Sequence, residues 1–268
     1  MSAGDSPGAD ARLAGRGIVL TRPEGLADGL ATRISASGGR PLLFPAVRIE
    51  DLADASPLHG LIDRLDAFDL AVFISPSAVH KAMALVRSRR GERPWPPTLA
   101  VAAIGRGSRR ELERQGFREV IAPPGHADSE ALLALPALQA VAGRQVIVFR
   151  GEGGRELLGD TLVARGAQVS YAECYRRTRP DADSAALLAA WARGGVHAVV
   201  VSSTEGLGNV YDMLGRLGQQ WLRDTPVFVP HARVAEAARQ QGIREVIVAE
   251  PGEAETHAAL VAYFATGK

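Results

Sequence analysis

The chain has 268 residues, of which 46% are hydrophobic and 23% charged, a composition that indicates a globular protein with one large or two medium domains. Its net charge of +1 argues against nucleic-acid binding, and its single cysteine, Cys174, excludes an internal disulfide. No apolar run approaches the roughly 20 residues of a membrane helix. Residues 1–14 lack the apolar segment of a signal peptide, so we expect a disordered tail there and a cytoplasmic protein.

In the first half of the chain, strands and helices are predicted to alternate. Apolar runs predict strands at residues 17–21, 41–47, 69–75, 99–104, 119–122 and 146–149. Amphipathic spacing and glycine stops predict helices at residues 23–37, 76–87, 109–115, 128–135 and 156–165. A polar segment over residues 48–65 interrupts the alternation.

The second half continues in the same way. Strands are expected at residues 168–175, 196–201, 226–229 and 245–248, and helices at residues 184–193, 204–217, 232–241 and 256–264. Several strands are nearly continuous runs of Val, Ile and Leu, as in parallel sheets that are covered on both faces. The order predicts an α/β protein.

The chain also repeats itself at a nearly constant offset of 126 to 128 residues. Arg22 and Arg150 each end a strand, as do Ser75 and Ser202, and the segment 118–121 (REVI) recurs at 244–247. A period of this length indicates a duplicated domain. We therefore expect two similar parallel-sheet lobes whose carboxyl-end edges, where ligands bind in open α/β sheets, face each other across a cleft.

Small polar residues follow several of the predicted strands. They are Ser75, Ser77, Gly105, Ser108, Ser202 and Ser203. Helix capping alone would explain them, but the same positions also present backbone N–H groups to a carboxylate or phosphate. Both interpretations remain open from the residues themselves.

No motif indicates a metal or a cofactor. The turn at residues 150–154 departs from the dinucleotide fingerprint, because Glu156 stands where the third glycine is required. The histidines are scattered singly, without metal-ligand spacing. The pattern favours a polyanionic ligand bound at many points without a cofactor.

Tyr175 ends a strand that is predicted to cross between the lobes. Its phenol is a candidate proton donor in a site that offers no better acid. The alternative is a tyrosine that packs at the hinge.

These residues resemble the uroporphyrinogen-III synthase family. The likeness covers nearly everything from Gly15 to Phe264, and its specificity comes from the order of short motifs. The motifs lie at residues 21–23 (TRP), 73–79 (FISPSAV), 103–105 (AIG) with Ser108, 150–156 (RGEGGRE), 175–177 (YRR), 201–203 (VSS) and 230–235 (PHARVA).

The resemblance implies two flavodoxin-like lobes joined by a two-stranded linker. Residues 15–44 and 177–268 would form the first lobe, residues 48–168 the second, and residues 41–47 and 169–176 the linker strands. The duplication alone would equally allow two sequential halves.

The resemblance also implies the reaction. Family members cyclise hydroxymethylbilane, a linear tetrapyrrole polycarboxylate, with loss of water and inversion of the last ring, and they need no cofactor. Tyr175 matches the family's proposed acid. The residues that would hold the substrate are Arg22, Ser75, Ser77, Gly105, Ser108, Arg150, Gly151, Ser202, Ser203 and Arg233. Some members carry threonines where this chain has His231 to Arg233, and threonine is common at position 108.

The resemblance implies a monomer, and it leaves open a transient contact with hydroxymethylbilane synthase, which supplies the substrate. Two rival functions remain. A non-catalytic relative would keep the cleft as a binding or regulatory module, and a two-lobed solute receptor would bind a small ligand. Tyr175 favours the enzyme over the non-catalytic relative. The receptor is the weaker rival, because such receptors usually work outside the cell and we expect no export signal in residues 1–14.

Overall fold

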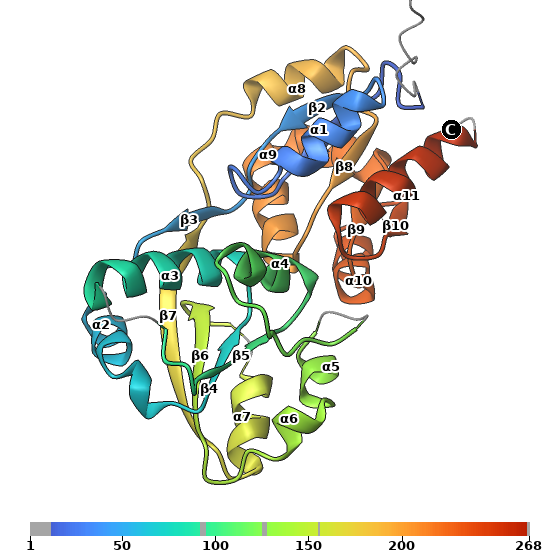
Figure 1. Cartoon of the computed structure of the whole chain (residues 1–268). Helices are drawn as coiled ribbons and strands as arrows, with labels where there is room; N and C mark the ends of the chain where they lie inside the picture. The colour runs from blue at the N-terminus through green and yellow to red at the C-terminus, as the bar shows by residue number, and fades with distance from the viewer. Residues whose placement is uncertain (1–11, 92–94, 125–127, 155, 267–268) are drawn as a thin grey trace, which may run out of the picture. The chain divides into compact units, whose positions relative to one another are not determined.

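The computed structural model describes residues 12–91, 95–124, 128–154 and 156–266, which fold as two compact units (Figure 1). The first unit contains residues up to Arg48 and from Thr178 onward, and the second contains Ile49–Arg177. Residues 1–11 of the predicted tail, which covers residues 1–14, lie outside the described residues. Leu13 also belongs to the predicted tail, but it is 0% exposed and its backbone N–H donates to the Ser37 carbonyl. The folded chain therefore begins before Gly15.

The first unit is built on a five-stranded sheet in the order β10-β9-β8-β1-β2, and every pair of neighbouring strands runs parallel. The strands are β1 Gly17–Leu20, β2 Arg40–Leu43, β8 Ala198–Val200, β9 Val227–Val229 and β10 Val246–Val248. The helices are α1 Asp28–Ala36, α8 Ala185–Ala192, α9 Thr204–Asp224, α10 Ala232–Gln240 and α11 Glu253–Ala265. The edge strand β2 contains Pro41. An edge strand suits proline because proline cannot donate a ladder hydrogen bond.

The second unit is built on a sheet in the order β3-β7-β6-β4-β5. The strands are β3 Arg48–Glu50, β4 Leu70–Phe73, β5 Ala100–Ala103, β6 Gln145–Gly151 and β7 Gln168–Thr178. The helices are α2 Ser56–Asp63, the 3₁₀ turn Leu65–Ala67, α3 Pro76–Arg90, α4 Arg106–Arg114, α5 Ser129–Leu133, α6 Pro136–Gln139 and α7 Leu157–Ala164. The chain passes between the units within β3 and at the end of β7.

The duplication extends to the order of the strands. Parallel pairing joins β5, β4, β6 and β7 in the second unit as it joins β9, β8, β1 and β2 in the first. The predicted strand at residues 119–122 is only an isolated bridge, in which Ile121 pairs with Ala102. Its copy Ile247 pairs with Phe228 as part of the full strand β10.

Each sheet carries apolar side chains on both faces. In the first unit, Val19 and Val199 pack with α8, α9 and α10, whereas Ile18 and Ala198 pack with α1 and α11. In the second unit, one core cluster includes residues of α2, α3 and α4 and the other includes residues of α5, α6 and α7. Burial on both faces is the reason that β1, β4, β8 and β9 are apolar throughout.

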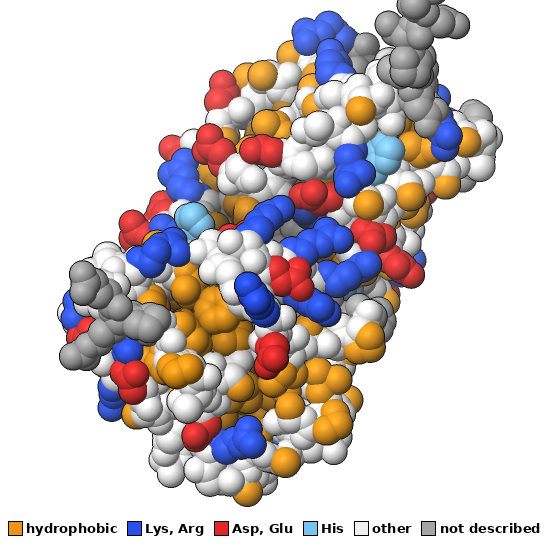
Figure 2. All heavy atoms as spheres, viewed as in Figure 1, with side chains coloured by type: hydrophobic (Ala, Val, Ile, Leu, Met, Phe, Trp, Pro, Cys, Tyr) orange, Lys and Arg blue, Asp and Glu red, His pale blue; other side chains and the backbone are white. Residues whose placement is uncertain are grey.

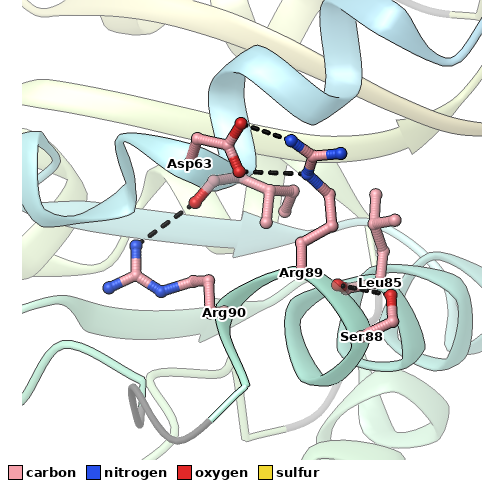
Figure 3. Close-up of polar contacts among 6 residues, drawn as sticks. Asp63, Leu85, Ser88, Arg89 and Arg90 are labelled. Carbon is pink, nitrogen blue, oxygen red and sulfur yellow. Dashed lines mark hydrogen bonds and ion pairs between the residues drawn. The ribbon is translucent and has the colours of Figure 1, made fainter.

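The prediction that residues 48–65 form a polar interruption without helix or strand is wrong, because the segment contains β3 and the helix α2. This helix buries Leu58, Leu61 and Ile62 against the core. The Asp63 carboxylate accepts two hydrogen bonds from Arg89 of α3, at 3.0 and 2.5 Å, and Arg90 donates to the Ile62 carbonyl at 3.2 Å (Figure 3). The arginines lower the pKa of Asp63, mainly through the Arg89 hydrogen bonds.

The segment that the resemblance assigned to a linker, residues 169–176, belongs to the second sheet. It forms most of β7 and pairs with β6 from Gln145 to Gly151. Likewise, Pro41 to Leu43 pair with β1 in the first sheet.

Among the described residues, no helix is both long and apolar enough to cross a membrane.

Candidate active site

Tyr175 lies near the end of β7, next to a β-bulge. Arg150 of β6 pairs with Glu173, but the next residue, Gly151, pairs with Tyr175, so that Cys174 is passed over. In a regular strand, Cys174 and Tyr175 would point to opposite faces. Here both side chains are buried in the same core cluster, and Tyr175 is 3% exposed. The bulge therefore sets the direction of the tyrosine ring.

The Tyr175 hydroxyl oxygen lies 2.9 Å from Ser75 Oγ. Ser75 is the N-cap of α3, and its Oγ accepts the Ala78 N–H at 3.0 Å. With that lone pair used, the serine hydroxyl hydrogen can be donated to Tyr175, which leaves the phenol hydrogen for a ligand. Ser75 and the positive end of α3 would then stabilise a phenolate.

A glycine turn lies against the tyrosine ring. A Cβ on Gly151 would lie 2.7 Å from Cε2 of Tyr175, so only glycine admits the ring there. The Glu152 N–H donates to the Tyr175 carbonyl at 2.7 Å. Gly153 and Gly154 have φ of +67° and +110°, values that favour glycine.

Arg150 is buried, with 5% of its surface exposed. Its guanidinium carbon lies 4.5 Å from the centre of the Tyr171 ring, and its Nε lies 3.6 Å from Glu173 Oε1. The Nε also donates to the Gly151 carbonyl at 3.3 Å. The guanidinium thus contacts Tyr171, Glu173 and the Gly151 carbonyl within the second unit.

The remaining candidates of the second unit lie at the starts of α3 and α4. Ser77 is half-buried in the first turn of α3, Gly105 is the extended N-cap of α4, and Ser108 lies in the first turn of α4 with 2% exposure. A Cβ on Gly107 would lie 3.2 Å from Pro76 Cγ, so the two helix starts are in contact. Basic side chains gather around α4 on the visible face (Figure 2), and α4 itself carries four arginines, Arg106, Arg109, Arg110 and Arg114.

In the first unit, Arg22 lines a small hollow at the carboxyl ends of β1, β8 and β9. Ser202, Phe228, Pro230 and Thr256 also line it. The Arg22 side chain is 24% exposed, and its NH1 lies 3.8 Å from Glu253 Oε1. Burial lowers the pKa of Arg22, and the Glu253 carboxylate opposes that shift. A partly desolvated cation in a hollow is suited to bind a carboxylate.

Two further candidates stand at helix starts of the first unit. Ser203 is the N-cap of α9 and accepts the Gly206 N–H at 3.0 Å. Arg233 is exposed in the first turn of α10. The N-cap serine equivalent to Ser75 is thus Ser203, whereas the sequence had paired Ser75 with Ser202.

The structure therefore brings Ser75, Gly151 and Tyr175 together in one unit, and Arg22 and Ser202 in the other. Sequence reasoning missed Tyr171 and Glu173, the partners of Arg150. The pattern of polar and apolar residues over 168–175 (QVSYAECY) does not indicate a bulge. The described residues contain no group of three or more His, Cys, Asp or Glu side chains that could hold a metal ion.

Comparison with known proteins gives a consistent result. A family model described as Uroporphyrinogen-III synthase HemD matches residues 28–260. The chain is 35% identical to the uroporphyrinogen-III synthase of Salmonella typhimurium over 234 residues, which cover 87% of this chain and 94% of that protein. It is 34% identical to the uroporphyrinogen-III synthase of Escherichia coli over 237 residues, with the same coverage of 87% and 94%.

Two solved structures share the fold. A mutant uroporphyrinogen III synthase from Thermus thermophilus matches with a TM-score of 0.58 and 16% identity, over 94% of this chain and 100% of that one. The uroporphyrinogen-III synthetase from Helicobacter pylori also has a TM-score of 0.58, with 12% identity over 92% of this chain and 99% of that one.

Proposed function

Because the chain belongs to the uroporphyrinogen-III synthase family, we propose that Tyr175 is its general acid and that both sheet edges hold the carboxylates of the substrate. The chain is a lyase of tetrapyrrole biosynthesis that cyclises hydroxymethylbilane. The reaction removes the terminal hydroxyl as water, inverts the last pyrrole ring through a spiro intermediate and closes the macrocycle.

The contact between Tyr175 and Ser75 carries the assignment of the acid. A hydroxyl leaves as water only after it gains a proton, and the phenol supplies that proton as the C–O bond breaks. The serine hydroxyl, 2.9 Å away, donates to the phenolate that remains, and the positive end of α3 stabilises its charge. The proton that the substrate loses when the macrocycle closes restores the phenol, so the cycle balances.

The substrate carboxylates are assigned to side-chain cations and helix starts. In the first unit, Arg22 supplies a cation beside Ser202, Ser203 caps α9, and Arg233 lies in the first turn of α10. In the second unit, Ser77, Gly105 and Ser108 lie where α3 and α4 present backbone N–H groups, and Gly151 lies beside Tyr175. Such sites bind carboxylates without reactive side chains, so catalysis consists mainly of positioning.

We further propose that the chain acts as a monomer in the cytoplasm and meets hydroxymethylbilane synthase transiently. Hydroxymethylbilane also closes without a catalyst, but without inversion. Direct transfer of hydroxymethylbilane between the two enzymes would limit the amount of substrate that closes without inversion.

The test compares the wild type with Tyr175→Phe on freshly made hydroxymethylbilane, and the uroporphyrin isomers are separated after oxidation. We expect the wild type to give mainly isomer III and the variant to form it at least tenfold more slowly, about 1.4 kcal/mol of barrier, while isomer I accumulates. Tyr263→Phe is the matched control, because it removes a phenol that hydrogen-bonds Glu245 instead. A folded Tyr175→Phe variant with wild-type turnover would remove the tyrosine from catalysis.

A further inference from the structure

The β-bulge next to Tyr175 is held by charged side chains. Arg150 and Glu173 are the last residues paired before the bulge, and the Arg150 Nε lies 3.6 Å from Glu173 Oε1. The same Glu173 oxygen accepts the Gly153 N–H at 3.1 Å. The pair therefore connects β6, β7 and the glycine turn that follows β6.

The glycine turn itself contacts Tyr175 in two ways. Gly151 packs against the tyrosine ring, and the Glu152 N–H donates to the Tyr175 carbonyl at 2.7 Å. A shift of the turn would therefore move either the ring or the backbone of Tyr175. The Ser75 hydroxyl, 2.9 Å from the phenol, tolerates little such movement, because hydrogen bonds weaken steeply with distance and angle.

Tyr171 completes the arrangement, since the Arg150 guanidinium lies over its ring. A buried guanidinium is costly unless a carboxylate and an aromatic face compensate it. Glu173 and Tyr171 provide both. We define Arg150, Tyr171 and Glu173 as the clamp.

The first unit has the arginine but not the clamp. At the offset of 128 residues that relates Arg150 to Arg22, the positions of Tyr171, Glu173 and Tyr175 are occupied by Leu43, Pro45 and Val47. The unit without the tyrosine acid thus also lacks the carboxylate and the aromatic ring. Since both units need a stable strand pair at this place, sheet stability alone does not require the clamp.

From this we infer that Arg150 and Glu173 are positioning residues for the reaction, which act by holding the bulge and the glycine turn so that the Tyr175 hydroxyl stays at Ser75. The inference rests on the proposed role of Tyr175. Misplacement of a reacting group by about 1 Å costs up to about a hundredfold in rate, so a clamp remote from the substrate can control turnover.

The experiment is a double-mutant cycle with Glu173→Ala and Tyr175→Phe, in which kcat and KM are measured on fresh hydroxymethylbilane. We expect Glu173→Ala to lower kcat at least tenfold with KM within about twofold of the wild type. Glu173→Gln keeps an acceptor for the Gly153 N–H and should recover part of the loss. The double variant should be no slower than Tyr175→Phe alone, because both changes disable the same proton transfer.

Glu50→Gln is the matched control. It breaks the ion pair of 2.7 Å between Glu50 and Arg176. Like Glu173, Arg176 is a residue of β7, but it lies outside the bulge. We expect it to keep the wild-type kcat. Circular dichroism and thermal unfolding establish that each variant is folded.

The outcomes separate the two proposals. If Tyr175→Phe retains the wild-type kcat, the role of Tyr175 is wrong, and with it the inference that depends on it. If Tyr175→Phe is slow but folded Glu173→Ala has the wild-type kcat, or if the two losses multiply in the double variant, the clamp is wrong and the acid stands. A merely structural Glu173 would lower the melting temperature and give multiplied losses.

Discussion

The two units share the order of four parallel strands, β9-β8-β1-β2 in the first and β5-β4-β6-β7 in the second, yet their carboxyl edges differ. In the first unit, Arg22 lines a hollow together with Ser202, and its NH1 lies 3.8 Å from Glu253 Oε1. In the second unit, the equivalent Arg150 is buried, and the Tyr175 ring packs against the turn where the chain leaves β6. A duplicated scaffold has thus kept its core and changed the residues at the edge.

The difference comes from the neighbouring strand. In β7, Tyr171 and Glu173 hold the arginine inside the unit, whereas the equivalent positions in the first unit carry Leu43 and Pro45. The same arginine at the end of the same strand therefore has different surroundings. In our proposals, Arg22 binds a carboxylate of the substrate and Arg150 orders the glycine turn.

The largest expected effect comes from exchanging the arginines for glutamine. Arg150→Gln should lower the free energy of unfolding by about 2–3 kcal/mol, because it leaves the Glu173 carboxylate without its cation. This loss of stability is at or below the roughly 3–5 kcal/mol expected when a fully buried ion pair loses one partner, because the Glu173 side chain is 38% exposed. Chemical denaturation measures the loss.

Arg22→Gln provides the contrast. It should change the free energy of unfolding by less than about 1 kcal/mol, since its ion pair is long and partly exposed. It should raise KM for hydroxymethylbilane about tenfold, as expected for one lost charge-assisted hydrogen bond. The comparison breaks down if Arg22→Gln is the more destabilised variant or if Arg150→Gln alters only KM.

A smaller effect is expected from Gly151→Ala. The added Cβ would lie 2.7 Å from the Tyr175 ring, and overpacking of this kind costs about 1–2 kcal/mol of stability. Turnover should fall as well, because a displaced ring would disturb the contact between the Tyr175 hydroxyl and Ser75. Gly60→Ala in α2 is the control: no atom lies within 4 Å of its Cβ, so it should stabilise the chain by about 0.5–1 kcal/mol. Equal melting temperatures for both variants would contradict the close contact.

The smallest effect concerns pH and the first unit. His197 Nδ1 accepts the Gly17 N–H at 3.0 Å. Burial, and then Arg16 and Arg40, lower the pKa of His197 below its ordinary value of 6.5. As pH falls through 6.5, His197 is therefore protonated in the unfolded chain before it is protonated in the folded chain. Its contribution to the free energy of unfolding should decrease as pH drops below 6.5 and be constant above it. Urea unfolding between pH 5 and 8 measures this slope. His197→Gln should flatten it, and an unchanged slope would assign it to other groups.

Much of the fold could be predicted from the residues. Runs such as Val146 to Phe149 and Leu70 to Phe73 are apolar because both faces of the strand are buried, so their pattern is visible without a structure. Glycine stops located the helix ends at Gly116, Gly166 and Gly242. The helix α2 was missed because its buried side chains are interrupted by Pro57, His59 and Gly60, which are unusual in a helix.

The candidate site was less predictable. The residue types of Ser75 and Tyr175 indicated a helix cap and a proton donor, but the 2.9 Å contact joins residues that are 100 positions apart. The sequence therefore determined the alternation of strands and helices, the duplication and the types of side chain at each strand end, because these depend on local spacing and burial. The tertiary structure alone decided that a bulge passes over Cys174, that Tyr175 meets Ser75 and that Arg150 is buried while Arg22 is not. Those outcomes depend on which strand lies beside which, and a neighbouring strand far away in the sequence leaves no mark on local patterns.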